Sequence, residues 1–126
     1  MKLHKLGFAM VIASGLLGST ATFAGNADFT IVNRTGFTMT AVYIAPANKK
    51  DWGKERLGEN FLLENNRSRV IKFSDRAACV QNMVVFIDQG QKEPTDLTWE
   101  DLNLCEINKL TLKYNKAKNE VSFDYE

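Results

Sequence analysis

Histidine is almost absent from this sequence. The only one is His4, near the start of the 126-residue chain. Without an imidazole beyond that point, the rest of the chain cannot form a Ser-His-Asp or Cys-His catalytic group. Histidine-ligated zinc, copper and haem sites are excluded for the same reason. We therefore expect a protein that is not an enzyme, with no catalytic residue, no cofactor and no metal site.

Long hydrophobic runs are also lacking. The apolar run Leu6–Leu17 is shorter than the roughly 20 residues with which a helix crosses a bilayer. It follows two lysines and precedes the small residues around Thr22–Ala24, which is the layout of a secretory signal peptide. The sequence predicts a signal peptide over residues 1–24 and a single domain over residues 25–126, located in the periplasm or secreted. No cysteine lies near the cleavage point, so we expect no membrane anchor after cleavage.

Cysteine is scarce, and Cys79 and Cys105 are the only two. An even number of cysteines in an exported chain favours a disulfide. A reactive thiol pair would need a neighbouring base or a short Cys-x-x-Cys spacing, and neither is present. The sequence therefore predicts a structural disulfide between Cys79 and Cys105.

No charge of one sign dominates the chain. It has 16 lysines and arginines against 15 aspartates and glutamates. The basic residues within 49–56 alternate with acidic ones, which is typical of a solvated loop. A nucleic-acid partner requires a concentrated basic face, so the sequence predicts none.

What the sequence does contain is a period-two alternation of apolar and polar residues, which predicts strands. We expect strands around Phe29 and Ile31 and over Phe37–Ala45, Phe61–Leu63, Ser68–Phe73, Met83–Ile87, Leu97–Trp99, Lys109–Tyr114 and Glu120–Tyr125. Met83–Ile87 is apolar on both faces, which favours a central strand. The predicted fold is all-β: a small antiparallel β-sandwich, Ig-like or related, of seven or eight short strands with one disulfide. A small barrel is the alternative.

Acidic residues gather around Trp99. They are Asp96, Glu100, Asp101 and Glu106, within a segment where we expect a loop over Glu100–Glu106. Paired carboxylates can hydrolyse glycosides, and several together can bind Ca²⁺. Asp96 and Glu100 flank a strand whose Leu97 and Trp99 point inward, so we expect two of the four acids to point away, and the loop lacks a glycine-centred ligand pattern. We therefore expect no tight Ca²⁺ site.

The two tryptophans are the candidate partner-binding residues. Trp52 lies in the tripeptide Asp51-Trp52-Gly53, where the glycine permits a sharp bend. Its indole could close the open end of the core, with its N–H bonded to a nearby acceptor. Trp52, like Trp99, could instead anchor a partner. The interpretation that we favour for Trp52 is the core plug.

Several short motifs occur together in a fixed order. They are Asn33–Gly36 at a strand end, Val42–Pro46, Asp51–Gly53, and the stretch DLNLCEINKLTLKY over Asp101–Tyr114. Together they resemble a family of small exported bacterial β-proteins, mostly uncharacterised, over Asp28–Tyr114. Some members carry the label argininosuccinate lyase, but that enzyme class is a large helical oligomer, which a short β-rich chain does not fit. The resemblance implies no catalytic residues.

The function that these observations favour is binding. We expect an exported bacterial binding or accessory protein of unknown specificity, whose partner is an unknown protein or a surface ligand. One alternative is a small inhibitor or immunity-type protein that neutralises a periplasmic enzyme. This alternative differs from the first only in the partner. Another is a calcium-dependent surface binder.

Overall fold

The computed structural model describes residues 27–74 and 77–126. The signal peptide predicted over residues 1–24 lies outside the described residues. The described part consists of two β-sheets with one short 3-10 helix, η1 (Leu104–Glu106). No helix in these two ranges is long and apolar enough to cross a membrane.

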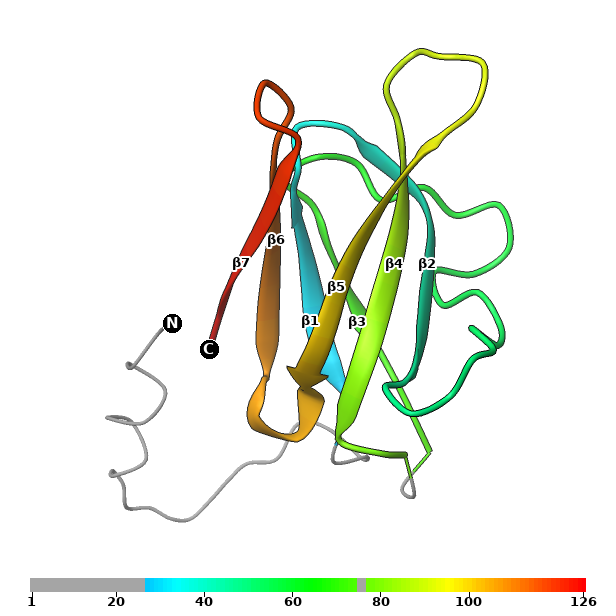
Figure 1. Cartoon of the computed structure of the whole chain (residues 1–126), viewed down its shortest axis with the longest axis vertical. Coiled ribbons are helices and arrows are strands. Elements are labelled where there is room, and N and C mark those ends of the chain that lie inside the picture. Colours follow the sequence, from blue (N-terminus) through cyan, green and yellow to red (C-terminus); the bar gives the residue numbers. More distant parts are fainter. Residues whose placement is uncertain (1–26, 75–76) are drawn as a thin grey trace.

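Seven strands form in the described ranges: β1 (Phe29–Arg34), β2 (Thr38–Pro46), β3 (Ser68–Ile71), β4 (Val80–Asp88), β5 (Thr95–Asn103), β6 (Lys109–Asn115) and β7 (Glu120–Tyr125). One sheet has the order β3-β1-β6-β7 and the other β2-β4-β5 (Figure 1). The predicted all-β sandwich is confirmed, and the barrel alternative is wrong because the strands form two separate sheets. β4, which contains Met83–Ile87, is the central strand of its sheet, as expected.

One strand pair departs from the antiparallel prediction. β1 and β6 run parallel, with Ile31 opposite Leu110. Parallel neighbours need a crossover connection, and here the crossover contains the whole β2-β4-β5 sheet. β1 lies inside its sheet, whereas the first strand of a constant-type immunoglobulin domain lies at an edge. The chain is therefore a related sandwich with a different strand order.

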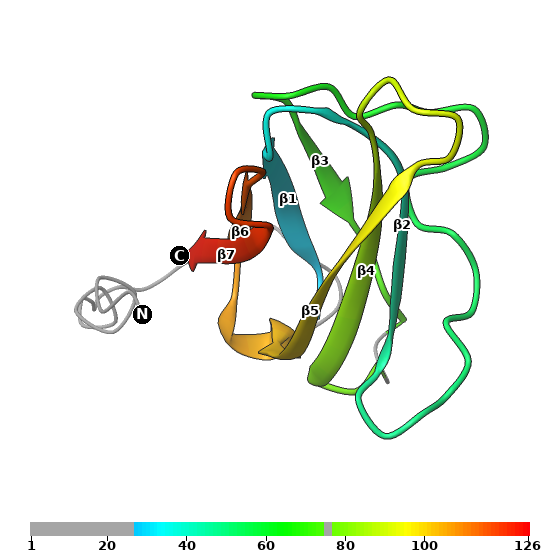
Figure 2. The same ribbon diagram turned by 45° about the horizontal axis from the view of Figure 1, so that its top comes forward.

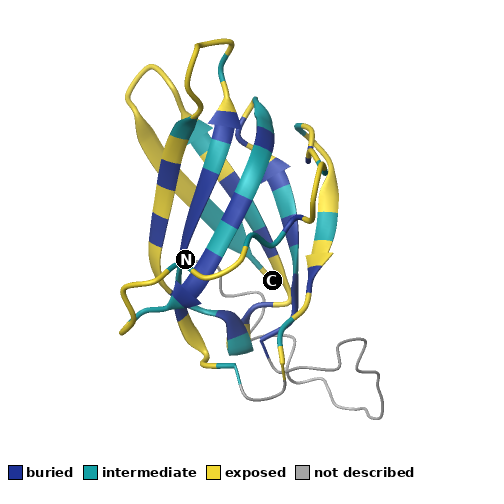
Figure 3. Ribbon diagram, turned by 90° about the vertical axis from the view of Figure 1, so that its right-hand side faces the viewer, coloured by how far each residue is buried: buried dark blue, intermediate teal, exposed yellow. Residues whose placement is uncertain are grey.

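The core lies between the two sheets. Burial alternates along most strands, as Figure 3 shows by colour, because successive side chains point to opposite faces. Fully buried side chains of the four-stranded sheet include Phe29, Ile31, Ile71, Leu110 and Leu112, and those of the three-stranded sheet include Met39, Val42, Met83, Val85 and Ile87. Both sheets therefore contribute their inner faces to one continuous core.

A β-bulge shifts the alternation in β2. The pairing of β2 with β4 changes register between Met39 and Ala41. Met39 is buried, but the next buried residues are Val42 and Ile44, while Tyr43 is only half-buried. An extra residue in one strand exchanges the faces that follow it. The alternation from Phe37 to Tyr43 thus does not continue on one face, and Tyr43 lies on the outer face.

Two predicted segments differ from the structure by more than their end residues. Phe61–Leu63 forms no strand but a single bridge, between Leu63 and Met39. β5 continues to Asn103, where we expected a loop from Glu100 onward. At this point Asp101 adopts a positive φ of 56°, uncommon for a residue other than glycine, and its N–H donates to Asn82 Oδ1 at 2.8 Å. A bulge in the β4–β5 pairing thus permits the strand to continue through polar residues.

The predicted disulfide is confirmed. Cys79 and Cys105 are bonded, with their Cα atoms 5.1 Å apart. The bond joins the residue just before β4 to the short helix η1 after β5. It therefore ties together the two chain segments at one end of the three-stranded sheet.

Candidate functional site

The outer face of the three-stranded sheet carries a groove of about 500 Å³. Small-ligand pockets usually enclose about 300–1,000 Å³. The residues that line the groove come from all three strands, from the loop after β2 and from the β4–β5 connection. They are Thr40, Ala41, Tyr43, Trp52, Val84, Phe86, Pro94 and Asp96.

Strand register places the groove residues in a row across the sheet. Phe86 of β4 lies opposite Ala41 of β2 on one side and opposite Asp96 of β5 on the other. Directly opposed residues on one face have Cβ atoms about 5 Å apart. The Tyr43 and Phe86 rings meet edge to face, with centroids 6.1 Å apart and planes at 82°. The bulge in β2 is what brings Tyr43 onto this face.

The loop after β2 is fastened by the carboxylate of Glu55. The N–H groups of Val42 and Leu57 donate to Glu55 Oε2 at 2.9 and 2.8 Å, and the N–H of Gly58 donates to Oε1 at 2.9 Å. The N–H of Arg56 donates to the carbonyl of Val42 at 2.7 Å. Figure 2 shows this loop running along β2 on the side away from β4. The loop therefore covers the edge of β2, which would otherwise present unpaired backbone groups.

Trp52 lies outside the core. It is half-buried and lines the groove, whereas Leu57, five residues later, is fully buried. The interpretation of Trp52 as a core plug is wrong, because Leu57 takes the inward position of this loop. No sequence pattern signals that choice, since the inward position depends on how Glu55 holds the loop.

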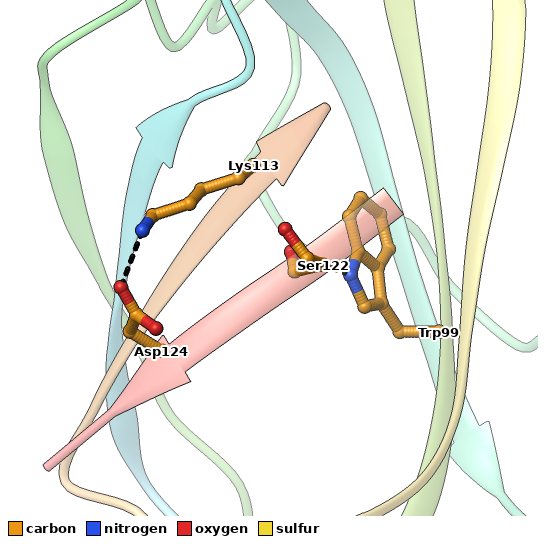
Figure 4. Close-up of polar contacts among 4 residues, drawn as sticks. All are labelled: Trp99, Lys113, Ser122 and Asp124. Atoms are coloured by element: carbon orange, nitrogen blue, oxygen red, sulfur yellow. Dashed lines mark hydrogen bonds and ion pairs between the residues drawn. The ribbon is translucent and has the colours of Figure 1, made fainter. Parts of the chain in front are cut away.

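Trp99 is a core residue. Only 4% of its surface is exposed, and its indole N–H donates to the carbonyl of Ser122 at 3.1 Å. Figure 4 shows the ring reaching from β5 to the backbone of β7, the edge strand of the other sheet. Trp99 therefore joins the two sheets. Its selection as a candidate partner-binding residue is corrected, because the ring has almost no accessible surface.

The four acidic residues around Trp99 do not meet at one site; only Asp101 and Glu106 line a common hollow, of about 120 Å³. Asp96, Glu100 and Asp101 lie along β5 and Glu106 lies in η1. Within residues 27–74 and 77–126, no three His, Cys, Asp or Glu residues are grouped so that they could hold a metal ion. Of the four acids, only Asp96 lines the groove.

A second hollow, of about 510 Å³, has a different chemistry. Lys54, Arg56 and Lys72 line it together with Phe73. The Arg56 guanidinium lies 4.5 Å from the centre of the Phe73 ring. Burial lowers the pKa of Arg56 below its usual value, although guanidinium stays protonated in proteins. The aromatic ring of this hollow is thus already in contact with a cation of the same chain.

The comparisons with known proteins leave the groove to be interpreted from its own residues. No family model, no curated protein and no solved structure matches this chain. The geometry and chemistry of the groove are therefore the basis for assigning its function.

Proposed function

We propose that this protein is an exported bacterial binding or accessory protein, not an enzyme, and that the groove beside Trp52 is its binding site. The observation that carries the proposal is the position of Trp52. This ring lines an open groove on a loop that Glu55 fastens to the sheet. Tryptophan and tyrosine on a rigid scaffold supply much of the binding free energy at protein interfaces.

The lining of the groove supports binding over catalysis. Asp96 is its only carboxylic acid, and apart from the phenol of Tyr43 the lining contains no other ionisable side chain. General acid–base and nucleophilic catalysis each need a positioned partner for the reacting group. A row of aromatic and apolar side chains with one carboxylate instead suits recognition.

The disulfide supports export. Such bonds form and persist in oxidising compartments such as the bacterial periplasm, and Cys79 and Cys105 are bonded. Together with the predicted signal peptide, this favours a periplasmic or secreted location.

A capture experiment with matched variants tests the proposal. The mature protein is immobilised, exposed to periplasmic extract, and compared with Trp52→Ala and with Val70→Ala. Val70 is 47% exposed on β3 of the other sheet, so Val70→Ala removes apolar surface far from the groove. We expect Trp52→Ala to lose a partner, identified by mass spectrometry, that the wild type and Val70→Ala both retain. If Trp52→Ala retains every partner of the wild type, the groove is not the binding site.

A further inference from the structure

We propose that the groove binds an arginine side chain of a partner polypeptide. This inference rests on the proposed function, because it names the ligand of the same groove. Its basis is the combination of three aromatic rings, from Tyr43, Trp52 and Phe86, with the single carboxylate of Asp96.

The charge of the groove favours a cation. Asp96 is the only charged residue in the lining. Within the described ranges no hydrogen bond or ion pair engages its carboxylate. Aromatic faces carry partial negative charge and attract cations that lie within about 6 Å of the ring centre. A cationic ligand thus meets attraction from both kinds of side chain, while an anion meets no counter-charge.

Comparable aromatic rings elsewhere in the described residues are in contact with cations of the same chain. Three half-buried phenylalanines each have a cation of the same chain over the ring: Arg69 over Phe61 at 3.7 Å, Arg56 over Phe73 at 4.5 Å and Lys116 over Phe37 at 5.6 Å. None of the three groove rings has such a cation among the described residues. The groove therefore has the rings and the carboxylate, and a partner would supply the cation.

The geometry favours arginine over lysine. Asp96 is the cross-strand neighbour of Phe86, so the carboxylate and the ring face the groove from adjacent strands. A planar guanidinium can stack on an aromatic ring while two of its N–H groups donate to one carboxylate. An ammonium group is compact and strongly hydrated, and lacks this planar fork. The two closest ring contacts within the chain are also made by arginines.

Matched peptides test this inference on the intact mature protein. The probes are acetyl-Gly-X-Gly amides in which X is arginine, lysine or citrulline, the neutral isostere of arginine. Binding is followed by NMR through the indole N–H of Trp52, which Trp52→Phe assigns, while the buried Trp99 signal serves as an internal reference. We expect the arginine peptide to shift the Trp52 signal with a Kd of the order of millimolar, and the citrulline peptide to bind about tenfold more weakly.

Variants that remove one negative charge test whether Asp96 is the residue that attracts the arginine peptide. Asp96→Asn should lower the affinity for the arginine peptide about tenfold and leave citrulline binding unchanged. Glu100→Gln is the matched control, because Glu100 is an exposed acid of the same strand that does not line the groove. It should bind the arginine peptide as the wild type does.

Three other outcomes of the peptide titrations would contradict the inference in whole or in part. Equal affinity for arginine and citrulline would overturn the inference and leave the groove as a binding site. Equal affinity for arginine and lysine would overturn the preference for a guanidinium. If no peptide shifts the Trp52 signal, the inference fails. The proposed function then stands only if Trp52→Ala still loses its captured partner.

Discussion

The two faces of the β2-β4-β5 sheet are both rich in apolar side chains, but they differ in what covers them. The inner face packs against the four-stranded sheet, and Trp99 there has its ring buried and its N–H bonded to Ser122. The outer face is bordered by the loop after β2 and the β4–β5 connection, and Trp52 there is half-buried at an open groove. The contrast shows that a tryptophan is buried on the face that the second sheet covers and half-buried on the face that it does not.

The largest effect that we predict is for the inner tryptophan. Trp99→Ala should lower the free energy of unfolding by about 3–5 kcal/mol, because it removes a buried ring and leaves a cavity. Trp52→Ala should lower it by less than about 1 kcal/mol, because its ring lies outside the core. Urea unfolding of both variants measures the difference.

Trp99→Phe is a matched control, because it retains an aromatic ring and loses the bond to Ser122. It should be more stable than Trp99→Ala. Equal losses for Trp52→Ala and Trp99→Ala would mean that the outer face is packed as tightly as the inner one, and the comparison would fail.

The disulfide should come next in size. Replacing both Cys79 and Cys105 by alanine opens a loop of 26 residues, and the loss of that constraint on the unfolded chain costs about 3.5 kcal/mol. Because the bond lies at the end of the sheet, away from the groove lining, peptide binding at low temperature should be unchanged. Urea unfolding and the NMR titration check the two parts separately.

Thiol titration of the wild type in denaturant without reductant controls this experiment, and it should find no free thiol. A double variant as stable as the wild type would show that the unfolded chain is not constrained by the bond.

A smaller loss of stability than for Trp99 or the disulfide is predicted for Glu55, in the loop after β2. Glu55→Ala leaves three backbone N–H groups without their acceptor, which should lower the free energy of unfolding by about 2 kcal/mol. Because the loop that carries Trp52 loses its fastening, binding in the groove should weaken as well. Unfolding curves and the Trp52 NMR signal measure the two effects.

Glu55→Gln retains one side-chain oxygen as an acceptor, so it should lie between Glu55→Ala and the wild type in both measurements. If Glu55→Ala binds as well as the wild type, the loop is held by contacts other than this carboxylate.

Local patterns in the sequence were enough to predict much of the fold. The apolar run at Met83–Ile87 predicted the central strand β4, and the alternation in the last 20 residues predicted the β6–β7 hairpin, because burial on one or both faces leaves a direct mark on composition. The presence of only two cysteines, both after a predicted signal peptide, was enough to predict the disulfide.

The groove could not be predicted in the same way. One extra residue in β2 moves Tyr43 to the outer face, and such a bulge has no marked composition when no glycine is involved. The row of Ala41, Phe86 and Asp96 exists only through the register of three strands. The position of Trp52 depends on hydrogen bonds that the Glu55 carboxylate accepts from backbone N–H groups of β2 and of its own loop, which a sequence pattern does not record.

The parallel pairing of β1 with β6 has a consequence for the order in which the chain folds. Ile31 pairs with Leu110, about 80 residues later, and the entropy of closing a loop grows with its length. The β6–β7 hairpin and the β2-β4-β5 sheet rely on shorter separations, and pairings of low sequence separation form faster. The four-stranded sheet is therefore completed late. Because β1 is synthesised first, it lacks its parallel partner β6 until almost the whole chain is available.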